Sequence, residues 1–300
     1  MRHRIRGSVP ALVLREARPA VLVVFLLRFG CGAALGAADR PEVDAGRLVS
    51  AGVAWAAAVL FSYLLNGCAD VLEDRANGSP RPIARGELAL PTARRVAGLL
   101  AVCALAAAWP AGPVVELAAL GLLLLGTAYS LGPYPLKRRA FGPPLVGVTG
   151  GLLTYLAGAA SVGGSGGAAL PVLAACMALW MGGVGGLLKD LSDREGDELA
   201  GRRSAVTVLG ERQVLALASG VAAAVGTALA AGALLEPVLT GGAVAAVAGA
   251  AAVVTRCVRY AADGSREERR RPYRAFMVTQ HVLHVLVLAT ALATALAPTA

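Results

Sequence analysis

Nine long apolar stretches constrain this chain more than any other feature of its sequence. They lie near residues 19–38, 47–66, 94–110, 113–130, 143–162, 169–188, 213–233, 237–256 and 275–297. Each is close to the roughly 20 residues that a helix needs to cross the hydrocarbon core of a bilayer. Because lipid offers the backbone no hydrogen-bond partners, such stretches cross it as helices. The sequence therefore predicts an all-α, polytopic membrane protein with about nine transmembrane helices.

The composition excludes the main alternatives to a membrane protein. Hydrophobic residues make up 57% of the 300 residues and charged residues only 16%, whereas soluble domains contain roughly 25% charged residues. This apolar content excludes intrinsic disorder, and five cysteines are too few for a disulfide scaffold. No segment between the apolar stretches is long enough to fold alone. We therefore expect one membrane domain over residues 1–300, in which residues 1–17 form a cytoplasmic tail and the first apolar stretch is a retained helix.

The basic residues are distributed unevenly between the two sides of the predicted bundle. Of the 28 lysines and arginines, 25 lie in the N-terminal tail and in alternate loops. Positive charge marks the cytoplasmic side, so the N-terminus is predicted to be cytoplasmic and the C-terminus, after nine spans, to lie outside. A nucleic-acid-binding face would not alternate with spans in this way. The excess of arginine over lysine, with abundant alanine and glycine, is typical of a GC-rich bacterial genome and indicates a bacterial cell membrane.

The first of two acidic clusters follows the second apolar stretch. Asn66, Asp70 and Asp74 are spaced i, i+4 and i+8, and on a helix they drift by only about 80° and share one face. Carboxylates on one face repel each other unless a cation lies between them. Their hard oxygen atoms suit Mg²⁺, which usually takes one or two carboxylates together with waters and substrate phosphates. Glu73 lies off this face.

The second acidic cluster ends the sixth apolar stretch. Asp190, Asp193 and Asp197 are spaced i, i+3 and i+7, which on a helix is a stripe within about 60°. A hydrated helix end would explain one such cluster. Two clusters on the same side, each after an even-numbered span, favour a shared site and fit an internal duplication. Facing a common cavity, they can hold two Mg²⁺ ions bridged by a diphosphate, which stabilise the charge on a departing phosphate.

Basic residues lie beside both acidic clusters. Arg81 and Arg85 follow the first cluster, Lys189 and Arg194 lie within the second, and Lys137 belongs to a further basic loop on the same side. Arginine forks and lysine ammonium groups match phosphate oxygens. The tendency of basic residues to lie on the cytoplasmic side of a membrane protein is enough to account for most of these charges. Beside so many carboxylates, however, Arg81 and Lys137 are candidate diphosphate ligands.

Three features inside the spans allow two interpretations each. Arg28 lies about nine residues into the first span, where it either faces a cavity or extends its side chain to the surface. His281 and His284 are spaced i, i+3 without a third ligand, so we interpret them as helix-packing residues rather than metal ligands. The glycine run at 182–186 favours a close helix contact over a nucleotide loop.

Together these motifs resemble those of the UbiA superfamily of intramembrane prenyltransferases. The family motif N-x-x-x-D-x-x-x-D is matched by Asn66, Asp70 and Asp74, its R-P-I by Arg81-Pro82-Ile83, its D-x-x-D-x-x-x-D by Asp190, Asp193 and Asp197, and its tyrosine-to-lysine loop by Tyr129 and Lys137. The resemblance covers about residues 15–297. It implies nine helices around a central cavity, with the two Asp-rich motifs on cytoplasmic loops. One departure is Gly67, where many members have a second aspartate.

The resemblance also implies a reaction and a set of site residues. An isoprenyl diphosphate would bind through Mg²⁺, its allylic C–O bond would ionise, and the prenyl cation would meet an electron-rich acceptor in a dry cavity. The five catalytic aspartates would be Asp70, Asp74, Asp190, Asp193 and Asp197, which hold Mg²⁺ together with Asn66. The diphosphate would be bound by Asn66, Arg81, Lys137 and Lys189, with Tyr129 near the reacting carbon.

Several functions are compatible with these motifs. The leading hypothesis is Mg²⁺-dependent transfer of a prenyl group to an aromatic or quinone-precursor acceptor. A terpene cyclase of the same family needs the same motifs but no acceptor. Transfer to a non-aromatic acceptor, such as a sugar phosphate or a glycerol phosphate lipid, is a third possibility. A transporter of an anionic lipid belongs to a different class, and diphosphate ligands on both sides of the cavity argue against it.

Overall fold

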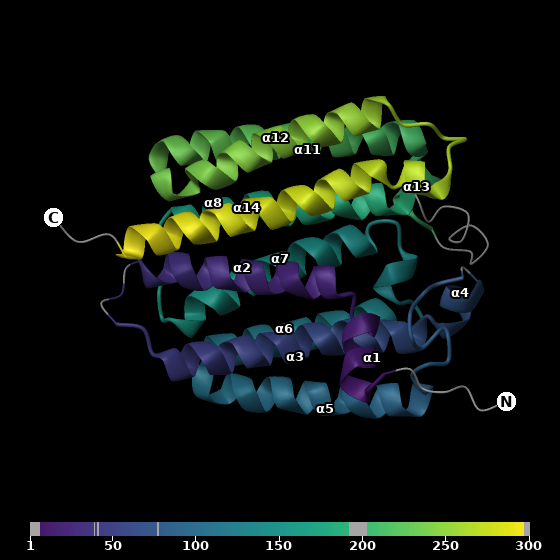
Figure 1. Cartoon of the computed structure of the whole chain (residues 1–300), viewed down its shortest axis with the longest axis horizontal. Helices are drawn as coiled ribbons and strands as arrows, with labels where there is room; N and C mark the ends of the chain where they lie inside the picture. Colours follow the sequence, from purple (N-terminus) through teal and green to yellow (C-terminus); the bar gives the residue numbers. More distant parts are fainter. Residues whose placement is uncertain (1–6, 39, 41, 77, 192–202, 297–300) are drawn as a thin grey trace.

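A computed structural model describes residues 7–38, 40, 42–76, 78–191 and 203–296. Within these ranges all regular secondary structure is helical, and nine helices are long and apolar enough to cross a membrane. They run side by side as one elongated bundle (Figure 1). The prediction of an all-α protein with about nine spans is confirmed, and each helix begins and ends within four residues of the stretch that predicted it.

The spans are formed by single helices or by short helices joined end to end. They are α2 (Pro19–Ala37), α3 (Ala45–Ala69), α5 (Leu90–Ala108) with η1 (Trp109–Ala111), α6 (Pro113–Ser130), α7 (Gly142–Ser161), α8 (Ala169–Leu179) with η3 (Trp180–Gly186) and its continuation to Leu191, α11 (Glu211–Leu235), η4 (Pro237–Leu239) with α12 (Thr240–Val258), and α14 (Arg271–Leu296). A proline in the first turn begins several of them, since its missing N–H would have no helical partner there. The short helix α1 (Val9–Glu16) precedes the first span, and short helices between the spans are α4 (Val71–Ala76), η2 (Leu136–Arg138), α10 (Ala205–Leu209) and α13 (Arg266–Arg269).

The bundle has two packed halves that meet at α2 and α7. On one side α3 packs against α5 and α6, and on the other α12 packs against α11 and α14. Helices α2 and α7 lie against each other between these groups (Figure 1). Both contribute to the two large hydrophobic cores, one of which contains Trp55 and the other Trp180. Helix α14 also contacts α2.

Glycine allows α2 and α7 to approach each other closely. A Cβ atom at Gly158 would lie 2.2 Å from the Phe29 carbonyl oxygen, and one at Gly32 would lie 2.5 Å from the Tyr155 carbonyl oxygen. Both obstacles are backbone atoms, which cannot rotate away. Contacts between small residues are how membrane helices pack when burial from water offers no driving force.

The glycine run in the sixth span makes the close contacts that the sequence predicts. A Cβ atom at Gly182 would lie 2.7 Å from the Pro144 carbonyl oxygen of α7, and one at Gly185 would lie 2.2 Å from the Phe276 ring of α14. The segment Trp180–Gly186 is a π-helix, a feature that its composition does not predict. Such wide turns are often found at functional sites, and this one leads towards Asp190.

The predicted cytoplasmic tail contains an ordered, docked helix. Helix α1 crosses the bundle instead of running along it (Figure 1). Leu12 and Val13 are buried in a third hydrophobic cluster with Leu64 of α3 and Ile83 of the following loop. The chain then turns sharply into α2 at Arg18, the single non-glycine residue with a positive φ among those described, at 58°. The sequence pattern does not predict this helix, because it is too short to count as a span.

We predict that Gly158→Ala destabilises the bundle by about 1–3 kcal/mol, the usual cost of overpacking a core, because the new methyl group meets backbone atoms of α2. Thermal unfolding in detergent, followed by the loss of the monodisperse species on size-exclusion chromatography, measures the shift in Tm. The matched control is Gly98→Ala, since a Cβ atom there has no neighbour within 4 Å. A Gly158→Ala variant as stable as the Gly98→Ala variant would contradict the packing described for α2 and α7.

Candidate active site

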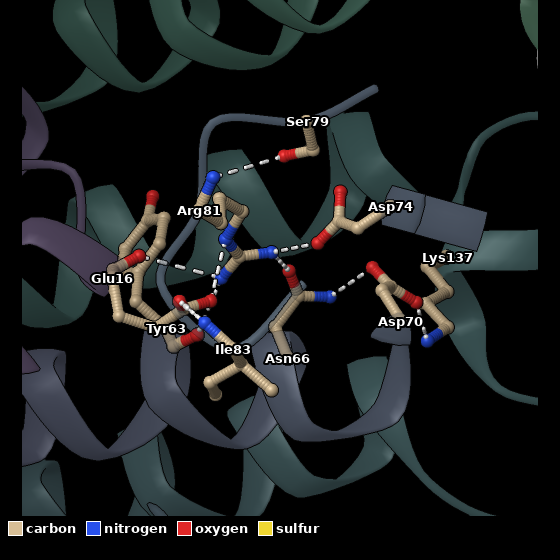
Figure 2. Close-up of polar contacts among 9 residues, drawn as sticks. All are labelled: Glu16, Tyr63, Asn66, Asp70, Asp74, Ser79, Arg81, Ile83 and Lys137. Carbon is tan, nitrogen blue, oxygen red and sulfur yellow. Dashed lines mark hydrogen bonds and ion pairs between the residues drawn. The ribbon is translucent and has the colours of Figure 1, made fainter. Parts of the chain in front are cut away.

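The first Asp-rich motif lies where α3 ends and α4 begins. Helix α3 ends at Ala69, Asp70 is its C-cap residue, and α4 starts again at Val71. The motif therefore bends at Asp70, whereas its spacing predicts one continuous helical face. The i to i+4 backbone hydrogen bonds from Asp70 to Asn66 and from Asp74 to Asp70 are kept. Because of these bonds the three side chains remain together, as Figure 2 shows.

Asp70 is held between an amide and an ammonium group. The Asn66 Nδ2 atom donates to Asp70 Oδ2 at 2.9 Å, and Lys137 forms an ion pair with Asp70 Oδ1. Lys137 belongs to η2, 67 residues further along the chain, and both charged side chains are nearly buried. The fold thus brings together two residues that the sequence predicts separately as a metal ligand and a diphosphate ligand.

Arg81 is the centre of the polar network at this end of the bundle (Figure 2). Its side chain is 5% exposed. The Nη1 atom donates to Asp74 Oδ2 at 3.0 Å and to Asn66 Oδ1 at 3.3 Å. The Nη2 atom donates to the Tyr63 carbonyl oxygen at 3.0 Å. A guanidinium group has five N–H donors in a fixed plane, so one residue connects several segments in a defined geometry.

Glu16 of α1 is the functional candidate that sequence analysis missed. It is 0% exposed, and its Oε1 atom lies 2.7 Å from Arg81 Nε. Its Oε2 atom accepts a hydrogen bond from the Ile83 N–H at 2.9 Å. Burial raises the pKa of the Glu16 carboxyl, and this effect outweighs the opposing effects of Arg81 and the Ile83 N–H. A signal was present in the sequence, since Glu16 lies four residues after Leu12, on the apolar face of a short helix.

The departure at Gly67 has a steric reason in this structure. A Cβ atom there would lie 2.1 Å from Glu16 Oε1 and 2.8 Å from Arg81 Nη2. The Glu16 carboxylate therefore occupies the space beside α3 that a side chain at position 67 would need. Glycine at this position and glutamate on α1 are two parts of one arrangement.

The second Asp-rich motif is described only at its start. Asp190 is nearly buried, and its Oδ2 atom accepts a hydrogen bond from the Ala205 N–H at 3.3 Å. Asp193 and Asp197 lie outside the described residues. Lys189, which directly precedes Asp190, and Tyr129 of α6 are both partly buried.

The described residues by themselves contain no cluster of three or more histidine, cysteine, aspartate or glutamate side chains that could hold a metal ion. Asn66, Asp70 and Asp74 nevertheless offer the hard amide and carboxylate oxygens that Mg²⁺ prefers. Mg²⁺ commonly takes one or two carboxylates and completes its shell with phosphate oxygens and water. The donor set of the first motif fits Mg²⁺ in this mode.

A second polar network lies deeper in the bundle, around Arg28 of α2. This arginine is 0% exposed, so it does not extend its side chain to the surface. Its Nη2 atom donates to Gln280 Oε1 of α14 at 2.7 Å, and Nη1 contacts the Met181 sulfur of the π-helix. The Nε atom is buried without a hydrogen-bond partner in the described part of the chain. The contacts of this charge with Gln280 and Met181 are thus with neutral groups.

The two histidines of α14 take part in helix packing. His281 contacts the Ala20 carbonyl oxygen of α2 at 3.0 Å through Nε2, and the Met277 carbonyl oxygen at 2.7 Å through Nδ1. His284 is fully buried, contacts the Tyr155 hydroxyl and stacks on its ring. These contacts agree with the interpretation of both histidines as packing residues.

Comparisons with known proteins agree with this fold. A UbiA homolog from Archaeoglobus fulgidus bound to GPP and Mg²⁺ superimposes with a TM-score of 0.73 and 21% identity, over 94% of this chain and 98% of that one. The apo structure of a UbiA homolog from Aeropyrum pernix gives a TM-score of 0.67 and 18% identity, over 91% and 98% of the two chains. At such identities the likeness concerns the fold alone.

Two sequence comparisons go beyond the fold. The homogentisate phytyltransferase of Synechocystis sp. is 40% identical over 88 residues, which is 28% of this chain and only 29% of that relative. The sequence pattern of the UbiA prenyltransferase family matches residues 26–283, which is most of the chain and includes both Asp-rich motifs. The protein, whose described residues include nine helices long and apolar enough to cross a membrane, therefore belongs to the UbiA prenyltransferase family.

Proposed function

We propose that this enzyme transfers a prenyl group from an isoprenyl diphosphate to an aromatic or quinone-precursor acceptor within the membrane, with Mg²⁺ as cofactor. The observation that carries the proposal is the alternation of carboxylates and cations at one buried end of an apolar bundle. Asp70 pairs with Lys137 and Asp74 pairs with Arg81. A Mg²⁺-diphosphate carries the same two kinds of charge, which these pairs complement.

The carboxylates of this arrangement suit the metal. We infer that Asn66, Asp70 and Asp74 hold Mg²⁺ on one side of the diphosphate, and that Asp190, Asp193 and Asp197 do so on the other. Bound Mg²⁺ would supply positive charge that stabilises the departing diphosphate. The structural relatives bound to GPP and Mg²⁺ or to DMAPP and Mg²⁺ support this assignment at the level of the family.

The cations of the arrangement suit the phosphate oxygens. Arg81 Nη1 and Lys137 Nζ now contact the very carboxylates that would turn to Mg²⁺. Each ion pair can therefore exchange partners without leaving a buried charge uncompensated, which would be costly. Lys189 would add a further phosphate contact, and Tyr129 would line the cavity near the reacting carbon. Donors that are already oriented need little reorganisation when the C–O bond ionises.

Two observations favour an aromatic acceptor over cyclisation of the prenyl chain. One is the partial likeness to a homogentisate phytyltransferase. The other is the buried charge of Arg28 among the neutral polar groups of Gln280 and Tyr155. In a cyclase the prenyl cation must move into the interior of the bundle. A fixed positive charge in this low-dielectric interior would repel such a cation. Polar groups at this depth suit an acceptor with polar substituents.

The orientation of the enzyme follows from the same residues. The end of the bundle that carries Arg81, Lys137 and Lys189 is the basic end, and we propose that it faces the cytoplasm of a bacterial cell, as the distribution of lysine and arginine predicts.

We predict that Asp70→Asn or Asp190→Asn lowers turnover at least about 100-fold, a typical loss when one charge-stabilising group is removed, while the protein remains folded in the membrane. Release of labelled diphosphate from a prenyl donor, with Mg²⁺ and acceptor, measures turnover. Glu73→Gln is the matched control, because this carboxylate lies in the same segment but contacts Arg138 at 3.5 Å. Near-normal activity of both aspartate variants would refute the metal assignment.

We predict that Lys137→Ala raises the apparent KM for the prenyl diphosphate by about tenfold or more, as expected for the loss of one charge-assisted hydrogen bond. The control is Arg138→Ala, which removes the neighbouring cation from an exposed position and should leave KM nearly unchanged. Steady-state kinetics in proteoliposomes provide both values. An unchanged donor KM in a folded Lys137→Ala variant would contradict the assignment.

The acceptor class can be tested with ten-, fifteen- and twenty-carbon prenyl diphosphates, each with an aromatic hydroxy acid, a glycerol phosphate, or no acceptor. We expect a prenylated product only with the aromatic compound. Diphosphate release without any acceptor, together with a hydrocarbon product, would identify a cyclase. A prenyl ether of glycerol phosphate would identify the non-aromatic alternative.

A further inference from the structure

We propose that Glu16 is a positioning residue that orients the Arg81 guanidinium towards the diphosphate. Helix α1 thereby contributes a side chain to the active site. This inference rests on the proposed function, in which Arg81 binds the diphosphate of the prenyl donor.

Helix α1 presents Glu16 to the interior by a simple amphipathic pattern. Leu12, Val13, Glu16 and Ala17 are the buried residues of this segment, while Leu14 and Arg15 are exposed. Leu12 and Val13 pack on α3 and on the loop that carries Arg81. A carboxylate that is 0% exposed destabilises a fold unless a cation and hydrogen bonds compensate it. Arg81 and the Ile83 N–H provide this compensation.

The contacts of Arg81 divide its donors into two groups (Figure 2). Nε lies beside the Glu16 carboxylate, and Nη2 donates to the backbone carbonyl oxygens of Glu16 and Tyr63. The remaining group, Nη1, faces Asn66 and Asp74. Glu16 and two backbone carbonyls thus hold one side of the guanidinium, and its remaining group, Nη1, donates hydrogen bonds into the Asp-rich motif. An arginine with this preorganisation loses less conformational entropy when it binds an anion.

Gly67 offers a way to separate positioning from simple docking of α1. Because a Cβ atom at position 67 would lie 2.1 Å from Glu16 Oε1 and 2.8 Å from Arg81 Nη2, an aspartate there would place a carboxylate close to the position that Glu16 now fills. With Glu16 shortened to alanine, the carboxylate would reach Arg81 from α3 instead of α1. Such a swap restores the orientation of Arg81, but it does not restore any contact of α1.

The experiment compares Glu16→Gln, Glu16→Ala, Gly67→Asp and the double variant Glu16→Ala/Gly67→Asp with the wild-type enzyme in proteoliposomes. The apparent KM for the prenyl diphosphate, the KM for the acceptor, and kcat are measured for each. Arg15→Ala is the matched control, since Arg15 lies on the same helix and forms an exposed ion pair with Glu87. It should leave all three constants nearly unchanged, as exposed pairs contribute little.

We expect Glu16→Gln to raise the donor KM by about tenfold, the effect of one weakened charge-assisted contact, with little change in the acceptor KM. Glu16→Ala should act in the same direction. Gly67→Asp alone should impair the enzyme, because two carboxylates would compete for one space. The double variant should return the donor KM to within about threefold of wild type, since only the Ile83 contact remains lost.

Two results would overturn the proposal. One is a donor KM in folded Glu16→Gln protein that equals the wild-type value. The other is a folded double variant no better than Glu16→Ala, which would assign Glu16 to docking of α1 alone. If Glu16→Ala does not fold, the isosteric Glu16→Gln variant decides. Failure of the proposed function would give different results from failure of this inference. Either the Asp70→Asn variant would keep its activity, or the wild-type enzyme would show no turnover with any prenyl diphosphate.

Discussion

The buried ion pair between Arg81 and Glu16 is the contact on which the polar network at this end of the bundle depends. Both charges are almost completely removed from water, where each alone would be strongly unfavourable. Their pairing fixes α1 against α3, closes the loop after α4, and leaves one edge of the guanidinium towards Asn66 and Asp74. The same pair explains why glycine occupies position 67, because any side chain there would collide with it.

This arrangement connects stability with chemistry. The acidic and basic groups satisfy each other, so an apolar protein can place charged side chains in the interior at one end of its bundle. In the function we propose, the charges of a metal-bound diphosphate would replace each partner in turn. The deeper network of Arg28, Gln280 and His284 keeps polar groups inside the bundle as well. There, neutral hydrogen-bond partners from α7 and α14 surround a cation that has little contact with lipid.

Most of the fold could be predicted because a membrane allows few solutions. A stretch of about 20 apolar residues must form a helix in lipid, so α2, α3 and α14 were recognisable from composition alone. The residues of the first Asp-rich motif were recognisable from their spacing. The geometry of the motif was only partly predictable, since helix α3 ends at Ala69 and the motif bends at Asp70. Helix α1 escaped prediction because it is short, and its structure depends on the surface that receives it.

By itself, the sequence determined the nine spans, the asymmetry of basic charge, and the residue types that match the family motifs, because these follow from local hydrophobicity and regular spacing. Only the tertiary structure decided which charges meet. The pairing of Lys137 with Asp70, and of Glu16 with Arg81, joins segments 67 and 65 residues apart. Such contacts depend on how helices pack, and a one-dimensional pattern does not encode which buried acid will compensate which buried base. The physical reason is that desolvated charges must find partners in space, wherever along the chain those partners lie.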